Sequence, residues 1–140
     1  ARHKSIIGIK EASGNMEQCM RIAKEMPKDF MLISGDDLLT TLLYSMGGVG
    51  VISVLANAVP LAFKKIKDSI ASGNHAIAHR EQFKLLEING PMYEEGNPVG
   101  IKQLLREFNI CGNQVRLPML PASESLQRKI REASKALKSS

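Results

Sequence analysis

The chain has 140 residues, of which 44% are hydrophobic and 24% charged, and its formal net charge at pH 7 is +5. This composition is ordinary for a globular domain and excludes a disordered or collagen-like chain. No apolar run approaches the roughly eighteen residues of a membrane helix, and the first residues lack the apolar core of a signal peptide, so we expect a cytoplasmic protein with no membrane partner.

Three segments in the first half of the chain repeat one pattern, in which an apolar stretch is followed by a loop and then by apolar residues at helical spacing. The expected strands are Ser5–Lys10, Phe30–Ser34 and Val49–Val54, and the expected helices are Met16–Met26, Leu38–Met46 and Pro60–Ser72. The strands are apolar on both faces and recur about every 20 to 25 residues, which predicts a parallel sheet covered by helices, the α/β class.

No strand is expected after Gly73. The helices expected there are Asn74–Ile88, Val99–Phe108 and Ser123–Leu137, joined by loops at 89–98 and 109–122. A parallel sheet of three strands leaves unpaired backbone at both edges, whereas a (β/α)₈ barrel closes on itself and takes roughly 250 residues. We therefore expect the carboxyl-terminal part of a larger protein, or one piece of a cleaved one, whose amino-terminal part is missing.

Basic residues gather only near the C-terminus. They are Arg128, Lys129, Arg131, Lys135 and Lys138. Such a cluster could contact phosphate or an acidic lipid surface, but aromatic residues, which stack on bases, make up only 4% of the chain. We interpret the cluster as the solvated face of a helix and expect no nucleic-acid partner.

Cysteine and histidine give no pattern typical of a metal site. Cys19 and Cys111 are far apart and form no CxxC pair, so we expect both to be reduced and packed. His75 and His79 stand four residues apart, as paired ligands can on one helix face, but no HExxH motif or carboxylate accompanies them. An exposed helix, no metal and no cofactor are expected.

Lys10 follows the apolar residues Ile6–Ile9 and ends the first expected strand. In α/β barrels the reacting groups lie at the carboxyl ends of strands, and partial desolvation of a lysine favours the neutral amine that attacks a carbonyl. Lys10 is therefore a candidate Schiff-base nucleophile. The spacing leaves open that Lys10 extends its charge out of the barrel mouth or pairs with Glu11.

Five segments resemble, in order and spacing, the dihydrodipicolinate synthase family of pyruvate-dependent class I aldolases. They are GIKEASGN (Gly8–Asn15), LISGDD (Leu32–Asp37), GGVGVISVLANAVP (Gly47–Pro60), EEGNPVGIK (Glu94–Lys102) and VRLPMLP (Val115–Pro121). The resemblance implies strands six to eight of a (β/α)₈ TIM barrel in residues 1–73 and a C-terminal helical extension in residues 74–140. It also implies that Lys10 forms an imine with pyruvate, whose enamine then attacks aspartate semialdehyde in lysine and diaminopimelate synthesis.

The resemblance assigns substrate contacts to four further residues. Gly35 and Asp36 would approach the aspartate semialdehyde, Ile52 would offer its backbone carbonyl beside pyruvate, and Asn97 would border the active-site mouth. Helix capping by Asp36 and Asp37 is an alternative that is compatible with binding. The Ile52 side chain could be purely core.

The segment before the expected helix Val99–Phe108 departs from the family. Gly100 stands where the family commonly has a proline, which predicts a more mobile loop, and Asn97 could simply form an Asx turn ahead of Pro98.

The family also uses a proton-shuttling tyrosine, a pyruvate-carboxylate loop and an arginine, all in the first five strands. Tyr44 and Tyr93 do not match that tyrosine, so we expect this chain to be inactive without the amino-terminal part. The family is usually tetrameric or dimeric. Alternatives are an N-acetylneuraminate lyase, a keto-deoxy sugar acid aldolase, or a non-catalytic binding domain on the same scaffold. The SGDD and ANAVP segments favour the synthase, and the presence of Lys10 speaks against a binding domain.

Overall fold

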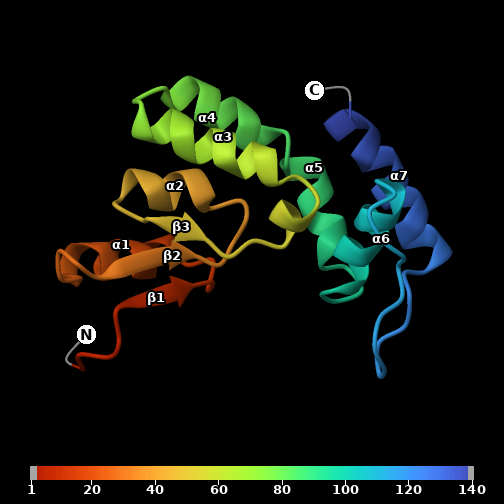
Figure 1. The fold of residues 1–140 in the computed structure, drawn as a ribbon, viewed down its shortest axis with the longest axis horizontal. Coiled ribbons are helices and arrows are strands. Elements are labelled where there is room, and N and C mark those ends of the chain that lie inside the picture. The colour runs from red at the N-terminus through yellow and green to blue at the C-terminus, as the bar shows by residue number, and fades with distance from the viewer. Residues whose placement is uncertain (1–2, 139–140) are drawn as a thin grey trace. The chain divides into compact units, whose positions relative to one another are not determined.

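The computed structural model describes residues 3–138, except the side chain of Lys138; Ala1, Arg2, Ser139 and Ser140 lie outside this range. Figure 1 labels its α-helices and strands; η denotes a 3₁₀ helix, which the figure leaves unlabelled. In chain order they are β1 (Gly8–Glu11), α1 (Met16–Glu25), β2 (Met31–Ser34), α2 (Thr40–Ser45), β3 (Gly50–Val51), η1 (Leu55–Asn57), α3 (Pro60–Ala71), α4 (His75–Phe83), α5 (Leu86–Asn89), η2 (Gly90–Met92), α6 (Val99–Glu107) and α7 (Glu124–Lys138).

The described residues fall into two compact units. The first unit contains the residues up to Ser53 together with Lys64–Gln82, and the second contains Val54–Phe63 and the residues from Phe83 onward. All three strands belong to the first unit.

The first unit is built on a parallel sheet with the order β1-β2-β3, as the sequence predicts. The strands are shorter than expected. Sheet pairing starts where Met31 N donates to Ile7 O (2.9 Å), because the preceding backbone turns back through a bond from Ile6 N to His3 O (3.0 Å). β1 then continues to Glu11, so the prediction that Lys10 ends the strand is wrong by one residue.

A small apolar core joins α1, β2 and α2. Cys19, Leu32 and Leu43 are its fully buried members. The helical spacing predicted from the sequence therefore describes α1 correctly. The Asn15 side chain accepts a bond from Gln18 N (3.1 Å) and caps the start of α1, whose last turn gives way to extended backbone at Met26, before Pro27.

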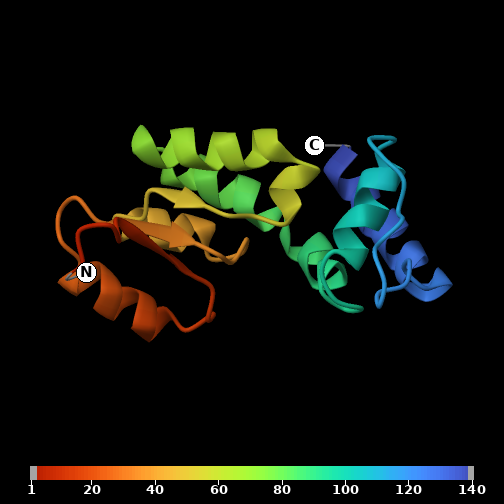
Figure 2. The ribbon, with the colours of Figure 1, turned by 60° about the horizontal axis from the view of Figure 1, so that its bottom comes forward.

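Two antiparallel neighbours, α3 and α4, run side by side in Figures 1 and 2, and Lys65 on α3 pairs with the buried Glu81 on α4 (2.7 Å). The single helix expected over Asn74–Ile88 is in fact two, because α4 ends at Phe83 and α5 starts at Leu86. Residues 74–88 contain neither proline nor glycine, so the sequence carries no signal for this break.

The second unit is helical, and α6 and α7 lie against each other in both views (Figure 2). Leu104 of α6 and Leu126 and Ile130 of α7 are fully buried. On α7 the buried residues Leu126, Ile130 and Ser134 recur every fourth position, which is the pattern of a helix with one face on a core.

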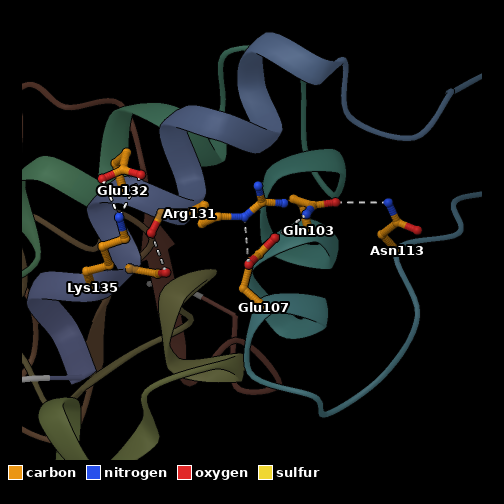
Figure 3. A network of polar contacts seen from close by, with 7 residues as sticks. Gln103, Glu107, Asn113, Arg131, Glu132 and Lys135 are labelled. Carbon is orange, nitrogen blue, oxygen red and sulfur yellow. Dashed lines mark hydrogen bonds and ion pairs between the residues drawn. The ribbon is translucent and has the colours of Figure 1, made fainter.

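A polar network ties the loop after α6 to both helices (Figure 3). Asn113 Nδ2 donates to Gln103 Oε1 (2.9 Å), Gln103 Nε2 donates to Glu107 Oε1 (2.8 Å), and Arg131 Nε donates to Glu107 Oε2 (3.4 Å). Because Gln103 is only 1% exposed, its bonds to Asn113 and Glu107 satisfy an amide that would otherwise be buried at a cost.

The basic residues of α7 lie on its exposed face. Lys129 pairs with Glu94 (2.6 Å), Arg131 with Glu107 (3.4 Å) and Lys135 with Glu132 (2.8 Å). This agrees with the interpretation of the cluster as a solvated helix face. The Lys138 side chain lies outside the described part of the chain.

Gly100 is the second residue of α6 and is buried, which agrees with the helix expected over Val99–Phe108. A Cβ atom at this position would lie 2.5 Å from Met92 Cα and 2.5 Å from Pro91 O, both of them backbone atoms of the chain around η2. Glycine at position 100 therefore permits close contact between α6 and the backbone around η2.

Gly100→Ala should therefore lower the free energy of unfolding by about 1–3 kcal/mol, even though alanine favours helix formation. Gly90→Ala is the matched control, because a Cβ at Gly90 would have no atom within 4 Å outside its chain neighbours and its own helix, and its φ of −53° suits alanine. Urea unfolding of both variants measures the difference. Equal midpoints would contradict a tight contact at Gly100.

Candidate active site

Lys10 lies near the carboxyl end of β1, where it pairs in register with Ile33 of β2. Neighbouring residues of a strand point to opposite faces of the sheet, and here Lys10 is exposed while Glu11 is buried. The Lys10 side chain runs across Gly35: a Cβ atom at position 35 would lie 2.5 Å from Lys10 Cε and 3.0 Å from Lys10 Cγ. The structure thus brings together two of the residues predicted for the site.

Glu11 anchors the end of β1 on the opposite face. Its carboxylate accepts bonds from Ser13 N (3.0 Å), Gln18 Nε2 (2.9 Å) and Cys19 Sγ (3.0 Å). Burial opposes ionisation of Glu11, but these donors outweigh it and lower the pKa of the carboxyl group below 4.5. The arrangement gives no support to the alternative that Lys10 pairs with Glu11.

Cys19 and Cys111 are both free thiols, and only one is packed. Burial, followed by the neighbouring Glu11 carboxylate, raises the pKa of the Cys19 thiol to about 11, so Cys19 serves as a hydrogen-bond donor. Cys111 is exposed, and Lys102 Nζ lies 3.6 Å from its sulfur, so the prediction that it is packed is wrong. It lies in the long loop after α6, which leaves it on the surface.

Glu11→Gln should destabilise the chain at neutral pH by about 1–3 kcal/mol, because an amide cannot accept all three donors. The folded-state pKa of Glu11 is depressed, so its stabilisation is present above pH 4.5 and is lost as the pH falls through the folded-state pKa. The difference in the free energy of unfolding between wild type and variant should therefore become smaller below pH 4.5. Chemical unfolding at pH 7 and pH 3.5 tests this, with the exposed Glu25→Gln as the control. A difference that stays constant with pH would contradict it.

The loop after β2 carries Asp36. Its carboxylate Oδ1 accepts a bond from Leu38 N (2.8 Å), and its backbone carbonyl accepts one from Ser34 Oγ (2.7 Å). Helix α2 begins only at Thr40, its N-cap is Leu39, and no side chain caps it. The alternative that Asp36 caps this helix is therefore wrong, because its side chain closes a turn before the helix begins.

Gln82, which the sequence did not single out, holds this loop from α4. Its Oε1 accepts a bond from Thr41 N (3.3 Å), and its Nε2 donates to Asp37 O (2.9 Å). Gln82 is only 4% exposed. Residues more than forty positions apart leave no local pattern in the sequence that would predict their contact. The role of this buried amide could be recognised only once the fold was known.

Ile52 follows the last residue of β3, and its N–H donates to Ser34 O (2.8 Å). Ile52 is 53% exposed within the described residues, so it is not part of the core that they form. Asn97 belongs to the second unit and is exposed in the turn before α6, which a bond from Val99 N to Gly96 O (3.0 Å) closes. The role of Asn97 stays a prediction.

Among residues 3–138 no group of three or more His, Cys, Asp or Glu side chains could hold a metal ion. His75 and His79 lie exposed on α4, as expected. Over the same residues no helix is long and apolar enough to span a membrane.

The structure has a parallel sheet whose strands are connected by helices, and Lys10 and Asp36 lie near the carboxyl ends of two of these strands. These features define an α/β protein with the organisation of a partial barrel. The sequence profile of the dihydrodipicolinate synthetase family matches residues 1–137, and the chain belongs to that family.

Similar proteins agree with this assignment. The 4-hydroxy-tetrahydrodipicolinate synthase of Cytophaga hutchinsonii is 45% identical over 130 residues, which cover 93% of this chain and 44% of that protein. The crystal structure of dihydrodipicolinate synthase from Aquifex aeolicus matches with a TM-score of 0.91 at 28% identity, over 98% of this chain and 47% of that one. The crystal structure of a dihydrodipicolinate synthase from Acinetobacter baumannii in complex with pyruvate matches with a TM-score of 0.89 at 27% identity. The match covers 95% of this chain and 46% of that one. The chain spans about half the length of these relatives.

Proposed function

We propose that this chain is the carboxyl-terminal portion of a 4-hydroxy-tetrahydrodipicolinate synthase and carries its imine-forming lysine, Lys10. Residues 1–73 supply strands six to eight of the barrel, and residues 74–140 supply the helical extension. The observation that carries the proposal is the placement of Lys10 near the end of β1, lying across Gly35, in a chain of this family. Below, the complete enzyme means this chain together with the rest of the barrel.

The reaction follows from amine chemistry. Lys10 Nζ attacks the keto carbon of pyruvate, and loss of water gives an imine that withdraws electrons from the neighbouring methyl group. A proton leaves that methyl group, and the resulting enamine carbon bonds to the aldehyde carbon of aspartate semialdehyde. The substrate's amino group then displaces Lys10 as the ring closes, which frees the lysine. The pyruvate complex of the Acinetobacter baumannii protein supports pyruvate as the first substrate.

The neighbouring residues would bind rather than react. Asp36 uses Oδ1 in its own turn and would offer its other carboxylate oxygen to the aldehyde substrate beside Gly35. The backbone of Ile52 is fixed by its bond to Ser34, so its carbonyl would keep one orientation beside pyruvate. Asn97 would border the mouth of the site.

The remaining barrel strands would cover the open side of the sheet. Within the described residues β1 is an edge strand; Ile7, just before it, is 62% exposed, and Ile9, within it, is 40% exposed. An apolar, unpaired edge of this kind suits a further strand. We infer a cytoplasmic enzyme that assembles as a tetramer or dimer and needs no metal or cofactor.

Comparison of substrates with the complete enzyme tests the proposal. We expect condensation of pyruvate with aspartate semialdehyde and no measurable cleavage of N-acetylneuraminate or of keto-deoxy sugar acids. Preferential cleavage of a sugar acid would assign the chain to another aldolase of the superfamily, and absence of any imine would favour a non-catalytic binding domain.

A further inference from the structure

Gly35 is a glycine for steric reasons. Its φ lies outside the left-handed region, so its backbone conformation does not require glycine. A Cβ at this position, however, would lie 2.5 Å from Lys10 Cε, 3.0 Å from Lys10 Cγ and 2.5 Å from Ala12 Cβ. At Gly50, by contrast, the nearest atom to such a Cβ is 3.9 Å away.

We propose that Gly35 is a positioning residue for Lys10: the methylene stem of Lys10 occupies the space that any other residue at position 35 would fill, and this sets where the amine lies. The inference rests on the proposed function, because it assigns Gly35 a role in imine formation. This role differs from contact with the second substrate.

The surrounding backbone has little freedom to relieve such a clash. Gly35 N donates to Glu11 O (2.7 Å), and the Glu11 side chain is held by Ser13, Gln18 and Cys19. The Lys10 stem is the softest neighbour, since its χ angles rotate independently of the sheet. Restoring an ordinary carbon–carbon separation of about 3.5 Å would move the stem by roughly 1 Å.

A shift of this size matters for covalent chemistry. A misplacement of about 1 Å at a reacting group can slow a reaction roughly 100-fold. Gly35→Ala should therefore slow imine formation at saturating pyruvate by about 10- to 100-fold, while the pyruvate concentration that gives half the maximal rate changes little.

The experiment uses the complete enzyme in four forms: wild type, Gly35→Ala, Ala12→Gly, and the double variant Gly35→Ala with Ala12→Gly. Ala12→Gly removes the Ala12 clash and leaves the Lys10 clash in place. Each form is mixed with pyruvate at several concentrations, and borohydride reduction followed by mass spectrometry gives the rate of adduct formation on the Lys10 peptide. Thermal unfolding is measured in parallel.

We expect the double variant to recover most of the thermal stability lost in Gly35→Ala and to remain slow in adduct formation. Recovery of both stability and rate would show that Gly35 serves only the packing of Ala12, which would overturn the inference. So would a wild-type rate in Gly35→Ala. If the wild type itself forms no adduct on Lys10, the proposed function fails, which is a different outcome from failure of the Gly35 role alone.

Discussion

Replacing Lys10 with methionine in the complete enzyme should abolish the condensation of pyruvate with aspartate semialdehyde, lowering the turnover number by roughly 10³-fold or more. Methionine keeps the length of the stem over Gly35 but has no nucleophile for the keto carbon. Arginine should do no better, because its guanidinium stays protonated and does not form the imine.

The control is Lys24→Met on α1, which removes an exposed lysine that the proposed chemistry does not use. Lys24→Met should turn over at the wild-type rate in a coupled assay of product formation. Wild-type turnover by the Lys10→Met enzyme would show that another group performs the chemistry and that the family resemblance here reflects ancestry alone.

These 140 residues by themselves should turn over the same substrates at least about 10⁴-fold more slowly than the complete enzyme. Lys10 is exposed among the described residues, whereas imine chemistry needs an amine in an enclosed site with a proton donor and a bound carboxylate. By the family resemblance, the groups that perform these tasks are expected in strands that precede the matched segments.

Purified chain, the rest of the barrel, and an equimolar mixture of the two should be assayed side by side. Activity that appears only in the mixture is the expected result. Measurable turnover by the 140-residue chain alone would contradict the proposal that the barrel must be complete.

The sequence predicted the elements that depend on local periodicity. Residues Met16 to Met26 repeat at helical spacing, and α1 follows within one residue. The parallel sheet followed from apolar strands separated by helices. The limits of the strands were predicted wrongly because they depend on hydrogen bonding between strands. The backbone before Gly8 forms a turn closed by a bond to His3 O, and β3 comprises only Gly50–Val51.

The sequence singled out residues of the candidate site, and their roles stay predictions. Lys10 stood out as a charge beside isoleucines, and the SGDD segment indicated a binding loop, but the contact between the Lys10 stem and Gly35 joins residues that only the sheet register brings together. Gln82 reaches the same loop from α4, over a sequence distance at which no local pattern exists. The exposure of Cys111 likewise depends on the path of a long loop.

Reductive trapping of pyruvate tests the central claim most directly. The complete enzyme is incubated with pyruvate, reduced with borohydride, digested and mapped by mass spectrometry, with reduction in the absence of pyruvate as the control. We predict a single N-(1-carboxyethyl)lysine on the peptide that contains Lys10. An adduct on a different lysine, or no adduct at saturating pyruvate, would contradict the assignment of Lys10 as the residue that bonds to the keto acid.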